Sequence, residues 1–125
     1  MLNALICGIG GKMGRNIFEI LQNDEKMRVV CGVDPHTPEG INVPVYADFK
    51  HINEDVDVII DFSSPAALEG ELEYATAKGV PAVIASTGFS QEQLEAIKEA
   101  SKKTAIFKTA NFSLGVNLMV NLVKK

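Results

Sequence analysis

The segment LNALICGIGGKMG, residues 2–14, decides the fold of this chain. Its first six residues form an apolar run of strand length, and after Gly14 the residues Ile17, Phe18 and Leu21 share one face of a helix. Glycines at such a junction let the chain turn sharply and let backbone N–H groups approach a diphosphate, which the helix dipole also attracts. The segment therefore predicts a dinucleotide-binding strand–turn–helix unit, with a plain tight turn as the alternative.

The alternation of strand and helix continues along the chain. Further apolar runs of strand length occupy residues 27–33, 56–60, 81–85 and 104–107, and helical patterns occupy 13–21, 66–78 and the residues after Ser90. This order predicts parallel strands joined by right-handed crossovers, with helices on both faces of the sheet. We therefore expect an α/β fold of the doubly wound, Rossmann type, in one domain that spans residues 1–125.

Two local patterns refine this outline. Ser90 and Gln93 have the spacing of a capping box, in which each side chain bonds the backbone N–H of the other residue at the start of a helix. Between residues 34 and 53, the prolines and Gly40 exclude a long helix. That stretch predicts a loop with at most a short strand around Val45.

Composition and charge limit the class of protein. A content of 46% hydrophobic and 22% charged residues is ordinary for a globular domain of 125 residues. The net charge of -4 argues against a nucleic-acid partner, because broad contact with phosphates needs a basic face. The chain shows neither a signal-peptide pattern nor the ~20 consecutive apolar residues of a membrane helix, so we expect a cytoplasmic protein. Cys7 and Cys31 lie in apolar runs and are expected to be buried, reduced thiols.

Asp34 ends the second predicted strand, 20 residues after Gly14. A carboxylate at this spacing accepts hydrogen bonds from the adenosine ribose hydroxyls, although Asp34 before Pro35 is also a pattern that opens a turn. The carboxylate repels a 2′-phosphate, and no arginine follows it to reverse that preference. We therefore expect NADH to bind at least as tightly as NADPH, while Lys12 and His36 leave NADPH binding open.

Three polar clusters directly follow predicted strands, at residues 61–65, 86–89 and 109–112. The carboxyl ends of parallel strands are where such sheets bind ligands, so these clusters are candidates for the site. In the first cluster, Ser64 before Pro65 is equally a helix cap with proline in the first turn.

Residues 113–125 have the pattern of a helix that is apolar nearly all round. A surface helix of that kind would expose a large apolar area. Either it is buried within this domain, or it leads toward an absent second domain or subunit interface, and the final Lys124-Lys125 favours a truncated chain.

Four motifs in this order resemble 4-hydroxy-tetrahydrodipicolinate reductase, also called dihydrodipicolinate reductase. They are GIGGKMG (8–14), DFS (61–63), STGF (86–89) and ANFSLGVN (110–117), and the resemblance covers essentially the whole chain. That family reduces 4-hydroxy-tetrahydrodipicolinate to tetrahydrodipicolinate with a pyridine nucleotide, in the diaminopimelate route to lysine. The resemblance implies an oxidoreductase that uses NADH or NADPH.

The resemblance also implies cofactor contacts for individual residues. The pyrophosphate would be wrapped by Gly8, Ile9, Gly10, Gly11, Lys12 and Met13, the adenosine ribose bound by Asp34, and the nicotinamide flanked by Ala85, Ser86, Thr87, Thr109, Ala110, Asn111 and Phe112. The chain departs from the family at Ala85, where glycine is usual, and at Thr109, where a smaller residue is common.

The family's catalytic stretch, which is rich in histidine and lies in a following domain, has no match in this chain. The resemblance therefore implies no catalytic residue here, so we expect a chain that binds NAD(P)H without turnover. It also implies a small dicarboxylate substrate bound only with that further domain, and a homo-oligomer for the intact protein. His36 and His51 are expected at the surface, and no metal-ligand spacing occurs.

Two alternatives differ in function. The cofactor domain of another amino-acid-pathway dehydrogenase would share the glycine loop and Asp34 but not the run 110–117. A non-catalytic NADH sensor would bind the dinucleotide and report occupancy through an interface made by the apolar last segment.

Overall fold

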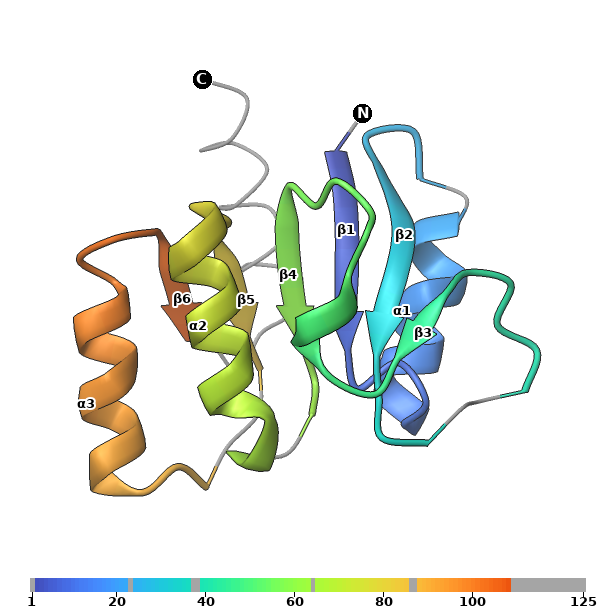
Figure 1. Ribbon diagram of the computed structural model, residues 1–125. Coiled ribbons are helices and arrows are strands. Elements are labelled where there is room, and N and C mark those ends of the chain that lie inside the picture. The colour runs from blue at the N-terminus through green and yellow to red at the C-terminus, as the bar shows by residue number, and fades with distance from the viewer. Residues whose placement is uncertain (1, 23, 37–38, 64, 86–87, 109–125) are drawn as a thin grey trace.

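The strands form one parallel sheet. A computed structural model describes residues 2–22, 24–36, 39–63, 65–85 and 88–108 (Figure 1). The strands are β1 (Leu2–Cys7), β2 (Met27–Val33), β3 (Val45–Tyr46), β4 (Val58–Asp61), β5 (Ala82–Ile84) and β6 (Ile106–Lys108), in the spatial order β3-β2-β1-β4-β5-β6. Successive strands are added outward from β1 in one direction and then outward from β4 in the other. The doubly wound fold is confirmed, with its switch point between β1 and β4.

Helices cover both faces of the sheet, as the sequence predicts. Helix α1 (Lys12–Gln22) packs its apolar face on the side of β1 that carries Ala4 and Ile6. The helices α2 (Leu68–Lys78) and α3 (Gln91–Ala100) lie on the opposite side, where Leu5 and Cys7 point (Figure 1). Strand β1 is therefore buried on both faces, and its carboxyl end is held rigidly between two layers.

The stretch 34–53 contains more regular structure than a plain loop. Val45 and Tyr46 pair with Gly32 and Val33, which confirms the short strand expected around Val45. The 3₁₀ helix η1 (Phe49–His51), which the sequence analysis did not predict, follows it. Asp48 caps η1 by accepting a hydrogen bond of 2.8 Å from the Lys50 N–H. Together β3 and η1 return the chain to the carboxyl end of the sheet.

Several boundaries differ from the predicted ones by a few residues. Strand β6 begins at Ile106 rather than at 104, because the chain continues in hydrogen-bonded turns after α3, including Thr104 N–H to Ala100 O at 3.1 Å. A second 3₁₀ turn, η2 (Pro65–Ala67), precedes α2, which therefore begins at Leu68. The capping box of Ser90 and Gln93 is present as predicted.

Some expectations concern residues that the structure does not describe. These are the helix expected over 113–125, the cap at Ser64, and the cofactor candidates at 86–87 and 109–112. In the described part of the chain, no helix has the length and apolar character needed to cross a membrane. Cys7 and Cys31 are both buried free thiols, as expected.

Candidate functional site

The glycine loop closes tightly between β1 and α1. Gly8 adopts a φ of +86°, in the left-handed region that favours glycine, and its N–H donates to the Val33 carbonyl at 2.7 Å. A Cβ on Gly14 would lie 2.1 Å from the Gly8 carbonyl oxygen, so only glycine allows α1 to approach the loop this closely. The two glycines thus place the N-terminus of α1 directly beside the end of β1.

The loop is exposed at its surface and includes two glycines, Gly10 and Gly11. Residues 10–13 are exposed, and the first turn of α1 carries N–H groups that have no partner within the helix. Ile9 behaves differently, because its side chain is fully buried and packs on Gly32 of β2. Of the predicted contacts in the loop, Ile9 is therefore suited to contribute only its backbone.

Asp34 joins the end of β2 to this loop. Its Oδ2 accepts a hydrogen bond of 2.8 Å from the Gly10 N–H. Its Oδ1 accepts one of 2.9 Å from the His36 N–H, which closes a local turn. The two interpretations of Asp34 from the sequence are thus both present in the structure, since the residue opens a turn and also lies against the glycine loop.

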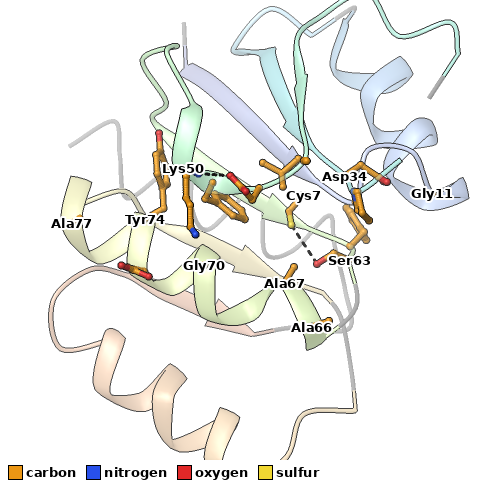
Figure 2. A pocket seen from close by; sticks show the side chains of 18 residues that line it. Cys7, Gly11, Asp34, Lys50, Ser63, Ala66, Ala67, Gly70, Tyr74 and Ala77 are labelled. Carbon is orange, nitrogen blue, oxygen red and sulfur yellow. Dashed lines mark hydrogen bonds between the residues drawn. The ribbon is translucent and has the colours of Figure 1, made fainter. Parts of the chain in front are cut away.

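A cavity of about 670 Å³ extends from the loop along α2 (Figure 2). One end is lined by Gly8, Gly11 and Asp34. The other end lies between η1, which contributes Phe49 and Lys50, and the middle of α2. The wall formed by η2 and α2 consists largely of small residues, with Tyr74 beside them: Ala66, Ala67, Gly70 and Ala77. The cavity therefore combines a polar mouth at the glycine loop with a mostly apolar interior.

Contacts between η1 and α2 fix the shape of this interior. The rings of Phe49 and Tyr74 pack with centroids 5.6 Å apart at an angle of 41°. The sequence analysis missed this wall. A signal for it was present in the spacing of Ala67, Gly70, Tyr74 and Ala77, which recur at helical intervals along one stripe.

The motif DFS forms the floor behind the loop. The Asp61 carboxylate is buried, and its Oδ1 accepts hydrogen bonds from the Ser63 N–H at 2.7 Å and from the Ser63 hydroxyl at 2.5 Å. A Cβ on Gly8 would meet the Ser63 backbone nitrogen at 2.9 Å, so this turn and the glycine loop are in contact. Within this cluster, Asp61 and Ser63 shape the backbone beneath the site.

Two further acidic groups share this buried region. The Glu71 side chain is fully buried, and burial followed by the charge of Asp61 raises the pKa of its carboxyl well above the ordinary value. Burial, and then the charges of Asp61 and Glu71, likewise raise the pKa of the Cys7 thiol. The Cys7 Sγ and one carboxyl oxygen each of Asp61 and Glu71 all lie within 4.8 Å of one another. The linear sequence does not reveal this cluster.

The opposite end of the predicted site is described only in part. Ala85 follows β5, and its N–H donates to the Asp61 carbonyl at 2.9 Å. Ile84 and Lys108 are paired residues at the ends of β5 and β6. Ser86, Thr87 and residues 109–112 lie outside the described residues, and their nicotinamide contacts stay predictions. His36 and His51 are exposed, as expected.

Comparisons with known proteins place these features in a family. Residues 2–112 match the family described as "Dihydrodipicolinate reductase, N-terminus". A 4-hydroxy-tetrahydrodipicolinate reductase from Caldanaerobacter subterraneus subsp. tengcongensis is 41% identical over 125 residues, which are 100% of this chain and 49% of that protein. The reductase of the same name from Alkaliphilus metalliredigens is 43% identical over 124 residues, 99% of this chain and 48% of that protein.

A solved structure supports the same assignment. The dipicolinate-bound dihydrodipicolinate reductase from Paenisporosarcina sp. TG-14 superposes with a TM-score of 0.74 at 26% identity, covering 94% of this chain and 50% of that one. The chain thus spans about half the length of the curated relatives that it matches. It belongs to the dihydrodipicolinate reductase family and matches the N-terminal part of its members.

Proposed function

We propose that this chain is the NAD(P)H-binding domain of a 4-hydroxy-tetrahydrodipicolinate reductase, the activity for which its relatives are named. The observation that carries the proposal is the hydrogen bond from the Gly10 N–H to the Asp34 carboxylate at the mouth of the cavity. It brings a glycine loop, a helix N-terminus and an acidic residue together at the carboxyl edge of a doubly wound sheet. Dinucleotides bind at this place in such folds.

The described residues suit a dinucleotide from its diphosphate to its adenine. The backbone of residues 10–13, at the start of α1, would hold the diphosphate. Asp34 would accept hydrogen bonds from the adenosine ribose, and the apolar interior between η1 and α2 would receive the adenine ring. By family resemblance, Ala85 to Thr87 and Thr109 to Phe112 would flank the nicotinamide. When bound, the reduced nicotinamide supplies a hydride.

The charges at the mouth bear on the choice of coenzyme. Asp34 is half-exposed and would lie beside the ribose, where its negative charge opposes a 2′-phosphate. Two exposed lysines counter this effect, Lys12 in the loop and Lys50 at the cavity. We therefore propose that both coenzymes bind and that NADH binds at least as tightly as NADPH.

The reaction itself is proposed for the longer protein. This chain would hold and orient the hydride donor, while the dicarboxylate substrate, its proton donor and the contacts between subunits would come from a further domain. Accordingly, we expect the 125-residue chain to bind coenzyme and to show no reductase turnover with substrate and NADH.

Calorimetric titration of the chain with NADH and with NADPH tests the proposal. We expect saturable binding of one coenzyme per chain, with NADH at least as tight as NADPH. A folded chain that gives no heat with either coenzyme would contradict the proposed function, and a tenfold preference for NADPH would contradict the role given to Asp34. Measurable turnover by the same preparation would contradict the proposal that a further domain supplies substrate binding and the proton donor.

A further inference from the structure

Glu71 is a buried carboxyl group with unusual surroundings. It lies on α2, its side chain is 0% exposed, and neither carboxyl oxygen has a hydrogen-bond partner of ordinary geometry among the described residues. A buried, ionised carboxylate without partners is very costly, and such a group normally takes up a proton. A carboxyl oxygen of Asp61, at the end of β4, lies within 4.8 Å of one of Glu71.

Hydrogen bonds tie Asp61 to Cys7 and Ser63. The Cys7 thiol donates to the Ser63 hydroxyl at 3.3 Å, and that hydroxyl donates to Asp61 Oδ1, which also accepts from the Ser63 N–H. This chain of hydrogen bonds links the Cys7 thiol through the Ser63 hydroxyl to Asp61 Oδ1. Two carboxylates so close together in a dry site cannot both be ionised at low cost.

We propose that Glu71 carries a proton that it shares with Asp61, and that this carboxyl pair is a positioning device for the glycine loop. The inference rests on the proposed function, because the loop is taken as the coenzyme site. Glu71 does not line the cavity, so its effect on a ligand would pass through the backbone that Asp61 holds.

The path from the pair to the loop consists of short contacts. Asp61 fixes the Ser63 backbone through Oδ1, and the neighbouring Phe62 N–H donates to the Cys7 carbonyl at 2.9 Å. The Ser63 backbone in turn lies against Gly8, where even a single added methyl group would collide. A second negative charge beside Asp61 would push α2 and the turn 61–63 apart, and the loop rests on that turn.

The groups that face Glu71 are acidic, so we expect NADH binding to weaken as the pH rises. Asp61 faces it from β4 and Cys7 from β1, and both are acidic. The neighbours Glu69 and Glu73 on α2 are exposed, as are Lys50 and His51 of η1 and Glu92 and Glu99 of α3. Among the described groups, the charge that acts on Glu71 is that of Asp61, which raises its pKa further after burial. Ionisation of Glu71 is therefore opposed by its neighbours and would disturb them when it occurs.

The test compares NADH affinity across a pH series in the wild-type chain, in Glu71→Gln and in the control Glu69→Gln. Glutamine keeps the size and a donor N–H but cannot ionise, whereas Glu69 is an exposed residue of the same helix. Above the pKa of Glu71 we expect the wild-type Kd to rise by up to about tenfold per pH unit, because one proton is lost. Glu71→Gln should keep a flat profile, and Glu69→Gln should follow the wild type.

Identical pH profiles for wild type and Glu71→Gln would overturn the positioning role, as would a folded Glu71→Gln chain that binds NADH weakly at every pH. A readout without coenzyme separates this failure from failure of the proposed function. In a chain labelled with ¹³C at the glutamate carboxyl, NMR should show one glutamate that stays protonated at neutral pH, and Glu71→Gln should remove that signal. The wild-type spectrum tests the shared proton even if the variant does not fold. If no glutamate remains protonated, or if added zinc binds stoichiometrically and displaces the proton, the shared-proton account is wrong.

Discussion

The carboxylate at the mouth of the cavity and the carboxyl pair behind it differ in almost every physical respect. Asp34 is half-exposed and accepts hydrogen bonds from two backbone N–H groups. Glu71 is fully buried, has no such donors among the described residues, and has Asp61 as its neighbour. A carboxyl group is thus suited to contact the coenzyme at Asp34 and to position the glycine loop at Glu71. The glycine loop contacts Asp34 directly and lies against the Ser63 backbone, which Asp61 holds.

The largest expected effect comes from breaking the loop itself. Gly14→Ala would place a methyl group 2.1 Å from the Gly8 carbonyl oxygen, and α1 would have to move away. We expect a loss of about 3 kcal/mol in the free energy of unfolding, with loss of NADH binding. Chemical denaturation measures the first effect and calorimetry the second.

Gly70→Ala is the matched control for that substitution. A Cβ at Gly70 would lie 3.7 Å from the nearest Phe49 carbon, an ordinary contact, within a helix where alanine is favoured over glycine. We expect it to leave the stability unchanged or to raise it by about 0.5–1 kcal/mol. Equal stability of the two alanine variants would show that the close approach of α1 to Gly8 does not constrain the loop.

The second prediction concerns stability at the buried pair. The folded-state pKa of Glu71 lies above its ordinary value of 4.5, so the folded chain holds a proton that the unfolded chain releases as the pH rises. The free energy of unfolding should therefore fall, by up to about 1.4 kcal/mol per pH unit, from pH 4.5 to the folded-state pKa.

Glu71→Gln should remove this dependence. The variant is then expected to be more stable than wild type at neutral and alkaline pH, by a margin that disappears toward pH 4.5. Urea denaturation at several pH values measures the margin, and Glu69→Gln should show none. If the difference in free energy of unfolding between Glu71→Gln and wild type did not change with pH, it would not arise from the proton on Glu71, and the prediction would be wrong.

The smallest of the three effects is expected at Asp34. Asp34→Asn keeps an acceptor for the Gly10 N–H but removes the charge. Hydrogen bonds to charged groups contribute about 1 kcal/mol more than neutral ones, so NADH affinity should fall roughly fivefold while NADPH affinity changes less. Calorimetry with both coenzymes measures the ratio, and Glu73→Gln, at the same cavity, is the control. If the ratio of NADH to NADPH affinity were the same in Asp34→Asn and in wild type, Asp34 would have no role in the choice of coenzyme.

Local patterns were sufficient to predict the sheet and its helices. The glycine loop and Asp34 are each followed or preceded by clear apolar runs, and their contact follows from the order of β1, α1 and β2. The ends of β6 and α2 differ from the predicted ones because turns at helix termini are set by backbone hydrogen bonds that a hydrophobic pattern does not encode.

The cavity wall and the buried pair depend on tertiary packing. No local pattern brings Phe49 of η1 against Tyr74 of α2. Glu71 alternates with Glu69 and Glu73 and so looks like part of a solvated face. Its position beside Leu72, on the stripe with Leu68 and Ala75, is the one sequence signal that it points toward the sheet.

Mapping of NADH binding by NMR tests the central claim most directly. In the ¹⁵N-labelled chain, we expect the largest chemical-shift changes at the amides of residues 8–13 and Asp34, with smaller ones at Lys50, Gly70 and Tyr74 around the cavity. The outward-facing groove between α2 and α3, which includes Glu69, Thr76 and Glu99, should remain unchanged. Saturable binding that shifts this groove and leaves residues 8–13 and Asp34 unperturbed would contradict the account.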